Sequence, residues 1–142
     1  MAVLKIVRNV TIKATPEACF NFWNDPTNFK RTFDVVSEVV PEGDNRSRWT
    51  LNLPSGKQEE VQMQRSGEFP KGLAWISLEG PITFNTGFAF MPEQDGTATS
   101  MALETEIGMG GLQGMMLPAM RPVIEQKIDE VLVRFRGAVE GS

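Results

Sequence analysis

The stretch Gly108–Val139, which reads GMGGLQGMMLPAMRPVIEQKIDEVLVRFRGAV, decides the fold that we expect for this chain. It opens with four glycines within seven residues, and glycine loses more conformational freedom on ordering than any other residue. We therefore expect a pliable loop over Gly108–Gly114. Soft, adaptable apolar surface accompanies these glycines, supplied by Met109, Met115, Met116 and Met120. We interpret this segment as the lip of a hydrophobic cavity.

The second part of the stretch predicts a long amphipathic helix over about Leu117–Glu140. Its apolar residues fall on one broad arc at about 100° per residue: Met116, Met120, Val123, Ile124, Ile128, Val131, Leu132 and Phe135. Pro122 is a candidate for the first helical turn, with Met115–Arg121 as a separate turn or kink. The arc is wider than packing on one small sheet requires, so we expect space behind the helix.

The first third of the chain predicts one strand and two short helices. Alternating apolar and polar residues over Val3–Lys13 indicate the strand. Thr15-Pro16-Glu17 is typical of a helix start, with threonine as N-cap, proline in the first turn and an acidic residue beside it. Asn24-Asp25-Pro26 ends this helix, and Pro26 starts a second one that runs through Phe33.

Between Asp34 and Ile107 the period changes to two, which predicts six strands in an antiparallel meander. Five turn clusters separate these strands, and Asp95-Gly96 in the last one is typical of a two-residue hairpin turn. The alternation gives the sheet one wet face and one apolar face. A twisted antiparallel sheet curls, and a helix laid in the curl leaves the concave face incompletely filled. We expect a cavity there of about the usual ligand-pocket size, a few hundred cubic ångströms.

Six segments carry a resemblance to a known superfamily: Ile12-Lys13-Ala14-Thr15-Pro16-Glu17, Phe22-Trp23-Asn24-Asp25-Pro26, Arg48-Trp49 before Pro54-Ser55-Gly56, Leu73-Ala74-Trp75 before Gly80, Gly87-Phe88-Ala89-Phe90 before Gly96-Thr97, and Phe135-Arg136 before Glu140. They resemble the SRPBCC superfamily (the START and birch-pollen-allergen helix-grip fold), most closely its bacterial polyketide cyclase/dehydrase-like branch. Nearly the whole chain takes part, as a single domain over residues 1–142.

This resemblance implies an α+β helix-grip fold. A curved seven-stranded antiparallel sheet would wrap around the long C-terminal helix, with two short helices after the first strand. It also implies a ligand cavity between that helix and the concave sheet face. It transfers no catalytic residue, because the relatives include polyketide aromatase/cyclases, lipid carriers and coenzyme-Q-binding proteins.

Composition excludes several classes of function. The net charge of -4, with no basic run, argues against nucleic acid or an anionic membrane as partner. No apolar stretch approaches the roughly 18 residues of a membrane span, and the N-terminus lacks the pattern of a signal peptide. A single cysteine, Cys19, excludes an intrachain disulfide, and we expect a cytoplasmic protein.

The sequence contains no histidine and no tyrosine. The usual general base near neutral pH is therefore missing, and Ser-His or Cys-His triads cannot form. A zinc site would have to rely on carboxylates and one thiol, so we expect neither metal nor cofactor. The sequence shows no catalytic constellation and favours a protein that is not an enzyme.

Candidate ligand-binding residues come from the inward positions of the sheet and from the helix with its lip. They are Trp49, Leu51, Val61, Met63, Trp75, Phe84, Thr86, Phe88, Met101, Leu103, Met115, Met116, Met120, Ile124 and Lys127. Lys127 lies close to the centre of the apolar arc. It either extends its stem to solvent or enters the cavity, where it would meet a carboxylate or an acidic ligand head group. Glu59, in line with Val61 and Met63, is the best carboxylate candidate, although a strand-end glutamate is commonly exposed.

Three functions stay open at this point. The first is binding or transport of a small hydrophobic molecule such as a lipid, a quinone or a polyketide-like aromatic. The second is an aromatase/cyclase-type enzyme that holds a reactive poly-carbonyl chain, with Glu59 and Lys127 as its only candidate proton-transfer groups. The third is a protein-interaction module, whose exposed apolar patch could also arise from homodimer formation.

Overall fold

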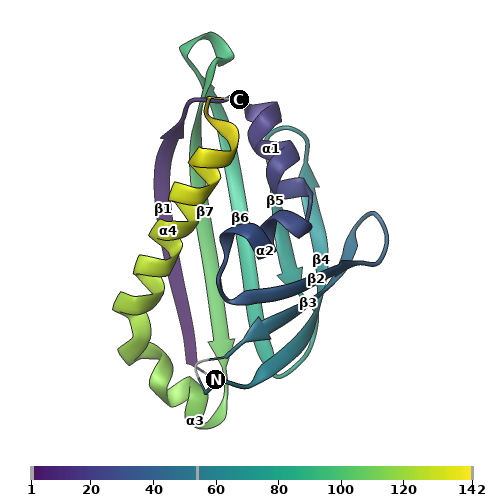
Figure 1. The fold of residues 1–142 in the computed structure, drawn as a ribbon, viewed down its shortest axis with the longest axis vertical. Coiled ribbons are helices and arrows are strands. Elements are labelled where there is room, and N and C mark those ends of the chain that lie inside the picture. Colours follow the sequence, from purple (N-terminus) through teal and green to yellow (C-terminus); the bar gives the residue numbers. More distant parts are fainter. Residues whose placement is uncertain (1, 54, 142) are drawn as a thin grey trace.

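The chain folds as a seven-stranded antiparallel sheet with its helices packed on one face (Figure 1). The computed structural model describes residues 2–53 and 55–141. The strands are β1 (Ala2–Ile12), β2 (Val36–Pro41), β3 (Arg46–Asn52), β4 (Gln58–Glu68), β5 (Gly72–Ser77), β6 (Ile82–Glu93) and β7 (Ala98–Met109). Their order across the sheet is β1-β7-β6-β5-β4-β3-β2, so the meander β2–β7 closes onto the first strand. The expected fold class is confirmed.

Two short helices follow β1, and a longer one ends the chain. The two after β1 are α1 (Pro16–Asn24) and α2 (Thr27–Thr32), and the longer one is α4 (Arg121–Val139). Between β7 and α4 lie the short helix α3 (Gly111–Met116) and the 3-10 turn η2 (Leu117–Met120). The N-cap of α1 is Thr15, whose Oγ1 accepts a hydrogen bond from the Ala18 amide at 3.1 Å. Pro122 lies in the first turn of α4, as expected, and η2 is the separate turn before it.

The glycine-rich segment before α4 differs from the pliable loop that the sequence predicts. Strand β7 continues to Met109, and α3 begins at Gly111, so Gly110 alone joins them. A Cβ atom on Gly114 would collide with the carbonyl oxygen of Met109. Glycine is therefore required at position 114 because two backbone segments approach closely, and the lip is a packed helical turn.

Two of the predicted turns are the β6–β7 and β3–β4 connections. Strands β6 and β7 separate after the pair Glu93–Ala98, so four residues connect them instead of the two that Asp95-Gly96 predicted. The connection contains a 3-10 turn, η1 (Gln94–Gly96), in which Asp95 has a φ of 61°. In the turn between β3 and β4, Pro54 lies outside the described residues.

Aromatic side chains fill one half of the space between α4 and the sheet. The ring of Trp23 from α1 stacks on Phe88 of β6, with centroids 4.2 Å apart and planes at 15°. Phe29 from α2 lies 4.6 Å from Trp49, and Phe135 near the end of α4 lies 4.9 Å from Trp23. Aromatic pairs at these separations stabilise a core beyond their buried area. The core is therefore concentrated where α1 and α2 cover the sheet.

Candidate ligand-binding site

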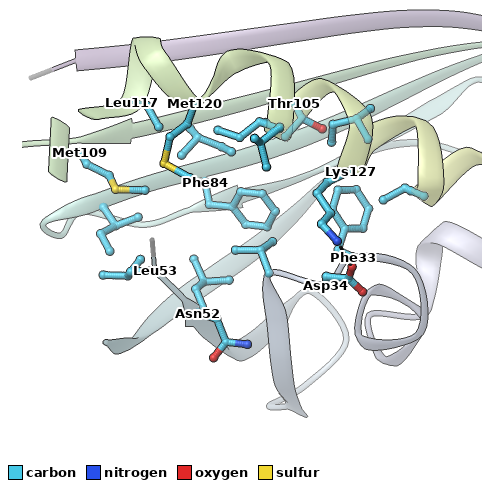
Figure 2. A pocket seen from close by; sticks show the side chains of 18 residues that line it. Phe33, Asp34, Asn52, Leu53, Phe84, Thr105, Met109, Leu117, Met120 and Lys127 are labelled. Carbon is cyan, nitrogen blue, oxygen red and sulfur yellow. Dashed lines mark hydrogen bonds and ion pairs between the residues drawn. The ribbon is translucent and has the colours of Figure 1, made fainter. Parts of the chain in front are cut away.

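The other half of this space is a cavity of about 260 Å³ under the N-terminal half of α4 (Figure 2). Its wall comes from three places along the chain. The helical side supplies Leu117, Met120, Val123, Ile124, Lys127, Ile128 and Val131. The sheet supplies Leu51, Asn52, Ile82, Phe84, Thr105, Ile107 and Met109, with Leu53 directly after β3, and the α2–β2 link supplies Phe33, Asp34 and Val35. Most of these side chains are apolar, as the sequence leads one to expect for a hydrophobic guest.

The distribution of side-chain size explains why this end is hollow. The aromatic residues of α1 and α2 lie at the far end, so only Phe33 and Phe84 contribute rings to the wall. The α4 residues that face the sheet here are aliphatic, and η2 redirects the chain before α4 begins. Methionine, valine and isoleucine are too short to close the remaining distance, whereas Phe135 does so near the other end of the helix.

One hydroxyl lies deep in this wall. Thr105 is fully buried, and its Oγ1 lies 3.2 Å from Oγ1 of Thr86 on the neighbouring strand. Each hydroxyl can donate one hydrogen bond and accept two, so the pair satisfies one donor and leaves one hydrogen for a further acceptor. The deep wall can therefore orient a polar atom of a ligand at a single place.

Charged groups gather at the rim, where α4 faces the α2–β2 link. Lys127 Nζ lies 3.0 Å from Oδ2 of Asp34 and 3.3 Å from Oε2 of Glu130. Arg134, two turns further along α4, donates to Oδ1 of Asp34 at 2.7 Å and to the carbonyl oxygen of Thr32 at 2.9 Å. Figure 2 shows Lys127 and Asp34 next to each other beside Phe33. These contacts connect α4 to the link that follows α2.

The ion pairs move the titration of these groups away from neutral pH. Hydrogen bonds from Arg134 and then Lys127 hold the pKa of Asp34 below its ordinary value. The hydrogen bond to Asp34 raises the pKa of Lys127 in turn. Both groups are therefore charged throughout the neutral range.

Five of the predicted site residues line the cavity: Leu51, Phe84, Met120, Ile124 and Lys127. The other ten do not. Trp49, Trp75 and Phe88 belong to the aromatic half of the core. Core positions also hold Val61, Met63, Met101 and Leu103, and Thr86 lies behind Thr105. They share the inward face of the sheet as expected, but that face is longer than the cavity.

Met115 and Met116, which we expected at the lip of the cavity, do not line it. The side chains of Met115 and Met116 are 77% and 53% exposed and lie outside the cavity wall. Met109, by contrast, is buried and lines the wall. Met109 is the last residue of β7 and is buried, whereas Met115 and Met116 lie on the exposed side of α3, where a loop was expected.

Glu59 does not meet Lys127. It is half-buried at the start of β4, opposite Leu51 of β3, and lies outside the cavity wall. The carboxylates beside Lys127 are Asp34 and Glu130, and sequence reasoning missed both. Asp34 follows a short helix and has no periodic neighbours, so no local pattern indicates that it faces a lysine 93 positions away.

Other sequence-based interpretations concern reactivity. Cys19 is fully buried, and burial raises the pKa of its thiol, in keeping with a packing role. Among residues 2–53 and 55–141, no three cysteine, aspartate or glutamate side chains gather as a metal-binding group. Within the same residues, no helix has the length and apolar character that crossing a membrane requires.

Comparison with known proteins assigns the chain to a family. The family model described as polyketide cyclase / dehydrase and lipid transport matches residues 3–140, and the chain belongs to this family. The resemblance to the SRPBCC superfamily is thereby confirmed. No curated protein matches the sequence.

Several solved structures share the fold. A Deinococcus radiodurans protein is 23% identical with a TM-score of 0.72, and the match covers 94% of this chain and 95% of that one. A START superfamily protein from Mycobacterium smegmatis is 11% identical with a TM-score of 0.71, over 96% and 97% of the two chains. The aromatase/cyclase Zhui from a Streptomyces species is 15% identical with a TM-score of 0.70, over 96% and 93%. At these identities the likeness concerns the fold alone.

Proposed function

We propose that this protein binds or carries a small hydrophobic molecule in the cavity between the sheet and α4. The observation that carries the proposal is the apolar wall around about 260 Å³ of space. An apolar cavity of about 150 Å³ in another protein stays dry and takes up benzene, so this one has room for a larger guest. Transfer of apolar ligand surface from water is worth about 25 cal/mol per Å² before the costs of association.

The first test is to fill the cavity from within. Ile124 is half-buried on the wall, so Ile124→Trp places a ring in the space that a ligand would occupy. We expect calorimetric titration with 1-decanol to show binding to the wild type and at least a tenfold loss of affinity in this variant, about 1.4 kcal/mol.

The matched control is Val133→Trp on the same helix. Val133 is 71% exposed and does not line the cavity, so the same added bulk lies in solvent. Its affinity for 1-decanol should equal that of the wild type. Equal loss in both variants would contradict binding at the cavity, and no binding to the wild type would contradict the proposal altogether. Native mass spectrometry of protein purified from its own host would then show whether a hydrophobic molecule accompanies it.

An aromatase/cyclase activity is the second candidate, because Lys127 and Asp34 both line the cavity. Enolisation of a poly-carbonyl chain needs a base whose pKa lies near the working pH. The pKa of Asp34 is lowered and that of Lys127 is raised, so both shifts oppose this chemistry. Turnover of a poly-β-ketone substrate by the wild type, lost in Lys127→Met and Asp34→Asn, would favour the enzyme over the carrier.

A protein-interaction module is the third candidate that the sequence leaves open. It would be favoured by an exposed apolar patch with no cavity behind it. The cavity under α4 removes that condition for Met109, Leu117 and Met120, which line it. Met115 and Met116 are exposed outside the wall, and ligand binding does not account for them.

A further inference from the structure

The rim of the cavity offers a positive charge to the polar end of a bound molecule. We propose that the ligand is an amphiphile with an anionic head group, which lies at the rim beside Lys127, while a short apolar chain fills the cavity. This inference rests on the proposed function, since it names the class of molecule that the same cavity binds.

Lys127 has hydrogen-bonding capacity that its neighbours in the fold leave unused. A lysine ammonium carries three donors and no acceptor. In the described part of the chain, it donates a hydrogen bond to Oδ2 of Asp34 at 3.0 Å and forms an ion pair with Oε2 of Glu130 at 3.3 Å. One donor therefore remains for a ligand. Lys127 lines the cavity while its side chain is 52% exposed, so that donor is available where the cavity meets solvent.

Asp34 keeps a cation beside it when Lys127 engages a ligand. Arg134 makes the shorter contact with Asp34, at 2.7 Å, and a further hydrogen bond to the Thr32 carbonyl oxygen keeps its guanidinium in place. Arg134 also attracts Glu130. The two carboxylates thus keep a cation beside them when Lys127 turns toward a ligand. Without Arg134, binding an anion would place uncompensated negative charges side by side.

Cationic and uncharged head groups would gain less than an anion at this rim. A cationic head group would meet Lys127 at the rim and would have to compete with it and with Arg134 for Asp34. An uncharged hydroxyl can accept a hydrogen bond from Lys127, but it lacks the Coulomb attraction that a negatively charged head group adds. An anion is therefore the head group that gains most.

The volume of the cavity limits the number of carbons in the apolar part of the ligand. If about 150 Å³ accepts the six carbons of benzene, then 260 Å³ accepts about ten carbons on the same scale. This favours a chain of about that length or a pair of fused rings over a long isoprenoid tail. Among the described residues of the wall, the deep hydroxyl of Thr105 provides the only polar side-chain contact below the rim charges and Asn52.

The test compares three probes of equal chain length at pH 7: decanoate, 1-decanol and decylammonium. We expect the wild type to bind decanoate about tenfold more tightly than decanol by calorimetry, with decylammonium weakest. In Lys127→Gln the preference for decanoate over decanol should disappear, whereas Lys127→Arg should retain it. Added salt should weaken decanoate binding and leave decanol binding unchanged.

Lys71→Gln is the matched control. It removes the same charge from the turn before β5, where the Lys71 carbonyl oxygen accepts from the Phe90 amide at 2.7 Å, at the far end of β6 from the cavity. Its preference for decanoate should be that of the wild type. Equal affinities for decanoate and decanol in the wild type would overturn the head-group proposal and leave the proposed function intact. Binding of none of the three probes would overturn both.

Discussion

At the scale of single residues, Asp34 connects parts of the chain that are far apart in sequence. It accepts hydrogen bonds from Lys127 and Arg134 of α4, and it directly follows Phe33, which lines the cavity. Contacts of this kind at exposed positions contribute little stability each, because water and salt screen them. Their value here is positional, since they hold α4 against the link between α2 and β2 at the rim.

The lowered pKa of Asp34 gives a pH-dependent prediction. A carboxyl group whose folded pKa is depressed adds stability above its unfolded pKa, and this contribution is lost as the pH falls through the folded pKa. Asp34→Asn should therefore lower the free energy of unfolding by about 0.5–1 kcal/mol at pH 7. The difference from the wild type should begin to shrink near the ordinary value of 3.8 and vanish only below the lowered pKa of the folded protein. Chemical denaturation between pH 7 and pH 2.5 measures this.

Glu38→Gln serves as the control for that series. Glu38 pairs with Lys30 on the surface at 3.1 Å, and in residues 2–53 and 55–141 it forms no ion pair with a second cation. We expect a smaller loss of stability at pH 7 than in Asp34→Asn. A difference between Asp34→Asn and the wild type that is unchanged at pH 2.5 would mean that its effect is not electrostatic.

At the scale of elements, α3 and the end of β7 form a close backbone contact beside the cavity. Gly114 can approach the Met109 carbonyl because it has no Cβ, and Met109 is part of the wall. The glycines of this segment are therefore not equivalent. Gly110 has open space around it, whereas Gly114 is packed against backbone.

Substitution of glycine by alanine should separate packing from flexibility. Gly114→Ala should destabilise the protein by about 1–3 kcal/mol, because its methyl group must displace α3 or β7. Gly137→Ala in α4 meets no atom within 4 Å and should stabilise by about 0.5–1 kcal/mol, since alanine favours a helix over glycine. Urea denaturation of both variants tests this contrast. A neutral Gly114→Ala would show that α3 is as pliable as the sequence first indicates.

At the scale of the whole molecule, the fold divides the space between α4 and the sheet into a filled half and a hollow half. The rings of Trp23, Phe29 and Phe135 fill one half, whereas the described wall of the other half contains the rings of Phe33 and Phe84 alone. Under the proposed function, the filled half holds the core together and the hollow half receives the ligand. A ligand would complete the core in the hollow half and bring α4 and the sheet into contact along their full length.

Ligand binding should therefore stabilise the entire fold. A molecule that binds the native state alone adds RT ln(1 + [L]/Kd), which is about 2.7 kcal/mol at a hundredfold excess over Kd. For a chain of 142 residues we expect the Tm to rise by about 5–10 °C with decanol at that excess. Calorimetric scans of the wild type and Ile124→Trp provide the comparison. An equal rise in Ile124→Trp would place the binding outside the cavity.

Much of the fold could be predicted because its signals are local. The alternation in β6 correctly placed Phe84, Thr86 and Phe88 on one inward face. Thr15 and Pro122 marked helix starts through chemistry that depends on adjacent residues. The four-residue connection at Asp95-Gly96 was missed, because the length of that loop depends on where the β6–β7 pairing ends.

The site was predicted only in part, and the reason is physical. Periodicity tells which face a side chain joins, but both core and cavity lie on the same face. Trp49 and Leu51 are two residues apart on β3 and point the same way, yet only Leu51 lines the cavity. The difference arises because Phe29 of α2 packs on Trp49, and such packing is settled in three dimensions.

By itself, the amino-acid sequence determined the order of the elements, the inward and outward faces of the strands, and the family to which the chain belongs. Hydrophobic periodicity and helix capping act between near neighbours, so they can be recognised along the chain. The tertiary structure alone decided where the apolar face stays unfilled and that Asp34, not Glu59, meets Lys127. Those features depend on which side chains arrive from distant segments, and close packing of whole elements determines that.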